Sequence, residues 1–230
     1  MDSVNNPTAQ RKLLAYTLPM AVFLGGLALV TLLKAIGGSL WLTSPEYWVF
    51  PLQTFASAAV LFYFWRDYEF QGLKKIPFVL VVAVFVFALW IAPQMWLGFS
   101  PRTEGFNPDS FSAQPTAYWA TVCLRFLRLV VIVPLVEEIF WRGFLLRYFI
   151  HEKFEEVPFG AFSWLSFAVV TVGFTFAHTR ADWVAAAVTG ALYNLVAYRT
   201  RSLTSCVLAH AVTNLLLGLW IMQSRQWGFW

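Results

Sequence analysis

The sequence has few charged residues. Only 12% of its 230 residues are Asp, Glu, Lys or Arg, whereas soluble globular domains contain about 25%. Apolar residues make up 59% of the chain, and the mean hydropathy is +0.63. This balance excludes an ordinary soluble domain and predicts an integral membrane protein.

Cysteine and basic tracts are also scarce. The two cysteines, Cys123 and Cys206, lie in apolar stretches without a second cysteine or a histidine-rich neighbourhood, so neither a disulfide framework nor a structural zinc site is indicated. The net charge of +4 is scattered along the chain, and no basic tract resembles a nucleic-acid footprint. We therefore expect the bilayer, and no nucleic acid, as a partner.

Seven mostly apolar runs approach the length of about 17 to 25 residues that crosses a bilayer as a helix. No repeat, low-complexity region or linker divides them. We predict an all-α protein, a transmembrane helical bundle of seven to eight helices that forms one domain over residues 1–230. The predicted helices are residues 13–36, 48–65, 76–97, 118–150, 161–177, 183–198 and 203–222.

The run 118–150 is too long for one straight crossing, and it contains Pro134. Proline removes a backbone hydrogen bond and kinks or breaks a helix. We therefore expect an interruption just before Glu137. Whether the chain from Glu137 continues the same crossing or begins a separate, partly re-entrant helix stays open, and the second arrangement would supply the eighth helix.

Basic residues between the apolar runs predict the orientation. If Arg11 and Lys12 are cytoplasmic, most basic loop residues fall on the cytoplasmic side, with Arg180 and Arg225 as exceptions. We expect a multi-pass protein of the cell membrane, in a bacterium the inner membrane. The basic residues that follow the rule are Arg66, Lys74, Lys75, Lys153, Arg199 and Arg201.

Glu137, Glu138 and Arg142 stand inside the run 118–150. A charge at membrane depth costs about 2.5 to 3.5 kcal/mol on insertion scales, so such groups usually face a protein interior and carry function. Residues four apart share a helix face, so Glu138 can pair with Arg142 while Glu137 cannot. Glu137, desolvated beside a like charge, is expected to exchange protons as a general base does. The alternative is that all three charges tie helices together.

His178, His210 and Asn214 are further polar groups in apolar helices, and Asn214 shares the helix face of His210. With the two glutamates they could activate water and hold an oxyanion. The sequence requires no cofactor, although Glu and His could also bind a divalent metal such as zinc. Counting about 1.5 Å per residue from the cytoplasmic helix ends places Glu138 about 18 Å deep, His178 roughly 24 Å and His210 about 10 Å. These depths do not coincide, and a shared site requires helix tilt, a kink at Pro134 or different helix boundaries to bring the residues together.

Three motifs in order, Glu137-Glu138-x-x-x-Arg142, Phe174-x-x-x-His178 and His210-x-x-x-Asn214, resemble the CAAX prenyl protease and bacteriocin-processing family of intramembrane endopeptidases. The resemblance covers residues 118–218, and the short chain is also similar to the exosortase-associated members.

The resemblance implies that Glu137 activates the attacking water, with Glu138 and Arg142 in support. It also implies that His178 assists this activation or the proton transfer, and that His210 and Asn214 polarise the scissile carbonyl. Either glutamate-dependent or metal-dependent chemistry is compatible with the family. The substrate would be a membrane-associated protein or peptide, and specificity for prenylated CAAX sequences is not carried over.

Two other functions remain open. A non-enzymatic membrane scaffold or bacteriocin-immunity protein would use the charges to hold helices together. A proton-coupled transporter would use Glu and His as a proton relay, but the sequence has no repeat and no paired broken helices in corresponding halves.

Overall fold

The computed structural model describes residues 7–230, so the first six residues of the predicted domain lie outside the described part. Within it the fold is all-helical, as predicted. Each of the seven predicted helices is present, with ends that differ by a few residues. The helices are α1 (Pro7–Ile36), α2 (Leu40–Thr43), α3 (Glu46–Tyr63), α4 (Ile76–Trp96), α5 (Pro115–Phe126), α6 (Val133–Glu138), α7 (Leu146–Tyr148), α8 (Trp164–Phe176), α9 (Trp183–Thr200) and α10 (Leu203–Ser224).

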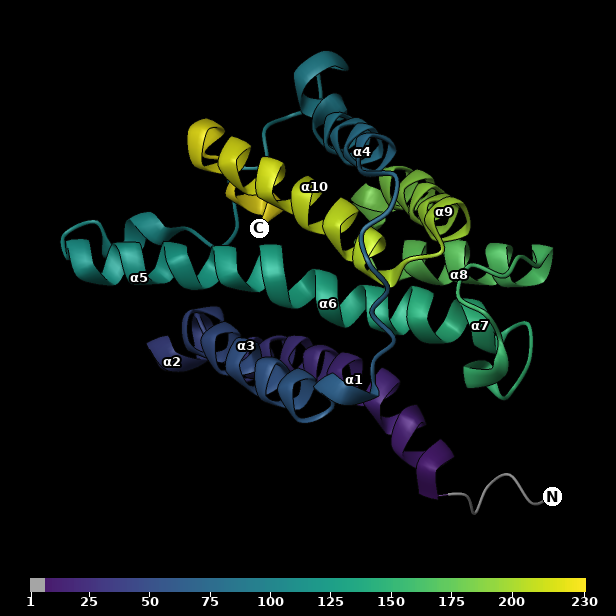
Figure 1. The fold of residues 1–230 in the computed structure, drawn as a ribbon. Helices are drawn as coiled ribbons and strands as arrows, with labels where there is room; N and C mark the ends of the chain where they lie inside the picture. The colour runs from purple at the N-terminus through teal and green to yellow at the C-terminus, as the bar shows by residue number, and fades with distance from the viewer. Residues whose placement is uncertain (1–6) are drawn as a thin grey trace.

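The helices α5, α6 and α7 form one continuous helix, Pro115–Tyr148, which crosses the whole view in Figure 1. Two π-helical stretches, Leu127–Ile132 and Ile139–Leu145, join its parts. The expected interruption at Pro134 is therefore wrong. Val133 donates its N–H five residues back, to the carbonyl of Arg128, so the hydrogen-bond register widens ahead of the proline while the backbone stays helical. No separate helix begins at Glu137.

This long helix separates two groups of helices (Figure 1). Helices α1 to α3 lie on one side of it, and α4, α8, α9 and α10 lie on the other. The packing agrees, since α1 pairs with α3, α10 with α4, and α8 with α9, while α10 and α1 both contact the long helix. The side chains of the long helix therefore reach the interior from both halves of the chain.

Within residues 7–230, four helices are long and apolar enough to cross a membrane: α1, Pro115–Tyr148, α4 and α10. Their outward side chains are large and apolar, for example Leu24 (50% exposed) and Val81 (68%), as lipid-facing helices require. Helix α8 has 13 residues, fewer than the roughly 20 that span the hydrocarbon core. The seven predicted helices are thus present, while seven crossings stay a prediction.

Loops that the sequence placed on one side of the membrane do meet at one end of the molecule. Arg11 pairs with Asp67 at 2.9 Å, and Glu69 bridges Lys12 (2.9 Å) and Arg147 (3.1 Å). These contacts join the start of α1, the loop after α3 and the end of the long helix. Which compartment this end faces stays a prediction.

Candidate active site

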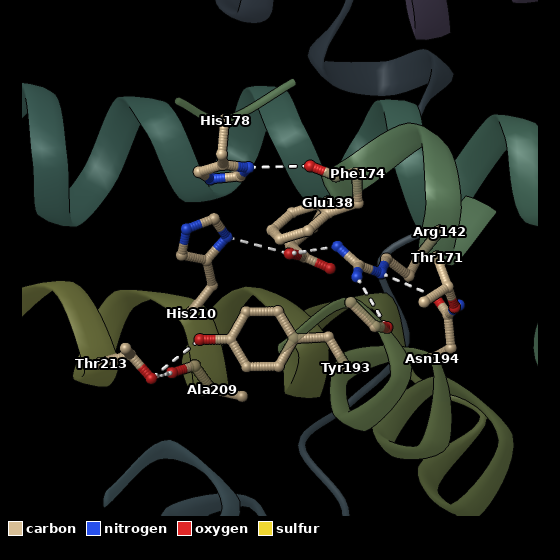
Figure 2. A network of polar contacts seen from close by, with 11 residues as sticks. Glu138, Arg142, Thr171, Phe174, His178, Tyr193, Asn194, Ala209, His210 and Thr213 are labelled. Atoms are coloured by element: carbon tan, nitrogen blue, oxygen red, sulfur yellow. Dashed lines mark hydrogen bonds and ion pairs between the residues drawn. The ribbon is translucent and has the colours of Figure 1, made fainter. Parts of the chain in front are cut away.

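Glu138 is the centre of a buried polar network, shown in Figure 2. Its side chain is fully buried, and its Oε1 lies 3.0 Å from Nη1 of Arg142 and 2.9 Å from Nδ1 of His210. The predicted pairing of Glu138 with Arg142 is therefore confirmed. Arg142 belongs to the long helix and His210 to α10, so this carboxylate joins two helices. Glu138 and His210 are 72 residues apart in sequence.

Arg142 extends the network to α9. Its Nε donates to Oδ1 of Asn194 at 3.2 Å, and its Nη2 donates to the carbonyl of Gly190 at 3.3 Å. The guanidinium also lies over the rings of Phe174 (4.9 Å) and Tyr193 (5.4 Å). Arg142 thus holds Glu138 in place and anchors α9 against the long helix.

Both candidate histidines use one ring nitrogen for positioning. His210 Nδ1 faces the carboxylate of Glu138, and His178 Nδ1 lies 2.8 Å from the carbonyl of Phe174. Carboxylate and carbonyl oxygens only accept, so in each neutral ring Nδ1 carries the proton and Nε2 keeps its lone pair. The two rings lie on the same side of Glu138 in Figure 2. Two imidazoles thereby each offer one free acceptor.

Glu137 is the carboxylate without a pair. It is half-buried, its Oε2 has no hydrogen-bond partner among the described residues, and it forms no ion pair there. It faces a cavity of about 300 Å³ that is also lined by His178, His210 and Asn214. The structure therefore brings the predicted residues of three separate motifs to one cavity, with Glu138 directly behind His210.

Asn214 has a partner that the sequence did not indicate. Its Nδ2 donates to the carbonyl of Leu129 at 2.8 Å. That carbonyl lacks its usual helical donors, because the N–H of Val133 goes to Arg128 and Pro134 has no N–H. An amide nitrogen has two N–H groups, so Asn214 keeps one for the cavity.

The depth estimate was wrong in treating the helices as parallel. In Figure 1, α10 runs at an angle across the long helix, so two residues at different distances from their helix ends can meet where the helices cross. His178 lies just past the end of α8, which is shorter than the predicted 161–177 helix. The angle of α10 and the early end of α8 allow His210 and His178 to line the same cavity as Glu137.

The residues do not form a ready metal centre. No three His, Cys, Asp or Glu side chains of residues 7–230 are grouped so that they could hold a metal ion. Oε1 of Glu138 already accepts from Arg142 and His210. We therefore derive no step through a metal.

Several residues near the cavity were not assigned a role from sequence. Trp90 and Arg128 line it, and the Trp90 ring lies 5.5 Å from that of His178. Asp182 occupies the N-cap position of α9 without a capping hydrogen bond, and pairs with Arg102 at 2.7 Å. Tyr193 donates to Thr213 (2.8 Å) and Asn194 donates to Thr171 (3.2 Å), so α9 is joined to α10 and to α8.

Comparison with known proteins agrees with this geometry. Residues 118–216 match the family described as Type II CAAX prenyl endopeptidase Rce1-like. The resemblance predicted for residues 118–218 is thereby confirmed, and the matched region contains all the candidate site residues. No curated protein and no solved structure matches the chain. The family match points to a protease, and together with the four apolar helices it makes this a membrane protein.

Proposed function

We propose that this protein is an intramembrane endopeptidase, a multi-pass protein of the bacterial inner membrane that cleaves a membrane-associated protein or peptide. The observation that carries the proposal is the unpaired carboxylate of Glu137, which shares a cavity with two histidines that each offer Nε2. In such an arrangement the free carboxylate can remove one proton from a water molecule, while a histidine nitrogen accepts a hydrogen bond from the other hydrogen and so orients the water.

In this mechanism Glu137 removes one proton from water, and His178 accepts a hydrogen bond from the other hydrogen. The water oxygen forms a bond to the carbonyl carbon of the substrate. The free N–H of Asn214 donates to the resulting oxyanion, as donors in oxyanion holes do. The C–N bond then breaks, and the proton held by Glu137 goes to the leaving amine.

His210 and Glu138 act behind this step. A carboxylate at Nδ1 fixes the tautomer of an imidazole and stabilises its protonated form when that form arises. Once Nε2 of His210 has taken a proton from solvent water before the attack, its N–H can donate to the oxyanion, and His210 keeps that proton through the step. Arg142 holds Glu138 in position through the 3.0 Å ion pair.

The test is cleavage of a membrane-anchored peptide library by detergent-purified protein, read by mass spectrometry. Glu137→Gln is compared with wild type and with Glu152→Gln, which makes the same change at an exposed loop position. We expect products from wild type and Glu152→Gln, and at least a hundredfold slower cleavage by Glu137→Gln at an unchanged melting temperature. A parallel sample with a chelator separates water-only from metal-assisted chemistry.

The scaffold or immunity function has one observation in its favour, the network in which Glu138 and Arg142 join the long helix to α9 and α10. That network does not use Glu137. If Glu137→Gln melts like wild type and neither protein cleaves any library member, the scaffold function replaces the protease.

A further inference from the structure

Two arginines of the long helix are buried away from the glutamates. Arg125 is 4% exposed and Arg128 is 5% exposed, and their spacing of three residues puts them on one helix face. Both line a second cavity of about 190 Å³ between α3, the loop before α5, and α5 itself.

Arg125 has N–H groups without acceptors. Its Nε and Nη1 are buried and make no hydrogen bond within the described chain. The guanidinium lies over the rings of Phe50 (5.1 Å), Phe106 (4.8 Å) and Trp230 (5.8 Å). These rings attract the face of the cation, but they offer no acceptor to its N–H edge. A buried donor without a partner is costly, so this edge is poised for an acceptor from outside the chain.

The neighbouring carboxylate does not fill that place. Glu46 attracts Arg125 electrostatically, and its Oε1 pairs with Lys34 at 3.0 Å. Its Oε2 is buried without a hydrogen-bond partner among the described residues, and no hydrogen bond joins either oxygen to Arg125. The two arginines also repel one another. The cavity therefore has an excess of positive charge held in an apolar, aromatic wall.

Arg128 connects this second cavity to the candidate active site, because it lines both. Its Nε donates to Oε1 of Gln53 at 3.0 Å, and Gln53 in turn donates to the carbonyl of Phe23. Gln53 fits there because Gly26 has no side chain; a Cβ at Gly26 would lie 2.7 Å from Gln53. The guanidinium of Arg128 is thus held at the junction, where the charge of Glu137 acts on it.

We propose that the second cavity is a subsite for a carboxylate of the peptide substrate. Arg125 binds the carboxylate, the aromatic wall receives the apolar part of the same residue, and the chain passes Arg128 toward Glu137. The planar guanidinium fork suits a carboxylate, to which it can make two parallel hydrogen bonds. The carboxylate belongs either to the C-terminus of the substrate or to an Asp or Glu side chain. This inference rests on the proposed protease function, since it names part of the substrate.

The test measures binding, so that it does not depend on cleavage. Fluorescence anisotropy in detergent follows a labelled, membrane-anchored peptide on Glu137→Gln protein. The peptide is made with a C-terminal acid or amide, and with an internal Asp or Asn. We expect one of these carboxylates to tighten binding at least tenfold over its neutral counterpart, which also identifies the source of the carboxylate.

Variants of the subsite, made in the same Glu137→Gln background, then locate the effect. Arg125→Gln should abolish the preference for the charged peptide, and Arg125→Lys should restore only part of it, because an ammonium lacks the fork. Thr121→Phe, which fills the cavity without removing a charge, should weaken the charged peptide in the same way and covers the case that Arg125→Gln does not fold. Arg225→Gln, at an exposed arginine outside both cavities, is the matched control and should keep the full preference.

Two results would overturn the proposal. One is equal affinity for all charged and neutral peptides. The other is a lipid effect without a peptide effect. Phosphatidylglycerol would then stabilise the Glu137→Gln protein more than phosphatidylcholine does, this difference would disappear when Arg125→Gln is added, and peptide charge would not change binding. The cavity would in that case bind a lipid headgroup. A third result separates the subsite from the proposed protease function. If peptide binding depends on Arg125 but wild type cleaves no peptide, the protease function is wrong and the carboxylate-binding site remains.

Discussion

Asn214 on α10 donates to the carbonyl of Leu129 on the long helix, at 2.8 Å, and Pro134 is the reason that this carbonyl is free. The proline has no N–H, and the N–H of Val133 bonds to Arg128. The same residue that shifts the backbone register thus creates the acceptor that positions a candidate catalytic amide. The change of helix register at Pro134 and the position of Asn214 in the cavity therefore depend on one another.

This relationship predicts an energetic coupling between Asn214 and Pro134. Asn214→Ala leaves the carbonyl of Leu129 without its donor and should destabilise the protein by about 1–3 kcal/mol. In a Pro134→Ala background the new backbone N–H can reach that carbonyl, so the same substitution should cost less. Melting temperatures and denaturant unfolding of the two single variants and the double variant, in one detergent, measure the difference. Equal costs in both backgrounds would contradict the coupling.

Arg142 and Glu138 predict a second pattern of stability. Arg142→Met leaves the fully buried Glu138 without its cation, and breaking a buried ion pair costs about 3–5 kcal/mol. Adding Glu138→Gln removes the uncompensated charge and should recover part of this loss. Glu137→Gln should change stability least, because Oε2 of Glu137 has no hydrogen-bond partner within the described residues and its charge acts on Arg128 only without an ion-pair contact. Thermal unfolding of the four proteins gives the order, and an Arg142→Met protein as stable as wild type would refute it.

The sequence predicted the helices and the separation of the two glutamates because both depend on local spacing. Apolar runs define helices, and the interval of four residues alone pairs Glu138 with Arg142. It could not predict that His210 meets Glu138, since this depends on how α10 crosses the long helix.

Pro134 was misread for a related reason. Proline predicts a lost hydrogen bond, but whether the helix breaks depends on partners elsewhere in the fold. Here the register of the helix shifts and Asn214 supplies the missing donor, 80 residues further along the chain. The surroundings of Arg125 and Arg128 could not be predicted from local spacing either, because their aromatic and glutamine neighbours come from α1, α3, the loop before α5 and the C-terminus.

Glu69 predicts how stability depends on pH at the end of the molecule where the charged loops meet. Partial burial of Glu69 would raise its pKa, but the hydrogen bond from Lys12 and the positive charge of Arg147 outweigh this and lower the pKa below 4.5. A carboxyl whose pKa is lower in the folded state stabilises the fold above its unfolded pKa, and this stabilisation is lost as the pH falls through the folded value. The melting temperature of wild type should therefore fall below about pH 4.5 more than that of Glu69→Gln. Parallel curves for the two proteins between pH 7 and 3 would show that Glu69 contributes nothing.

His178 predicts a loss of activity that can be chemically restored. Its ring is held by the carbonyl of Phe174 and lies beside Trp90 at the wall of the cavity. In the proposed mechanism this ring orients the attacking water by accepting a hydrogen bond, and a misplaced reactant can cost about 10²-fold in rate. His178→Ala should therefore cleave at least a hundredfold more slowly at a similar melting temperature. Because the substitution removes the ring and leaves its space open to the cavity, added imidazole should restore part of the rate, whereas it should not restore Glu137→Gln. His151→Ala, at the exposed loop histidine, is the matched control and should keep wild-type activity with or without imidazole. If imidazole fails to restore His178→Ala while the protein remains folded, His178 positions the neighbouring groups and does not itself orient the attacking water.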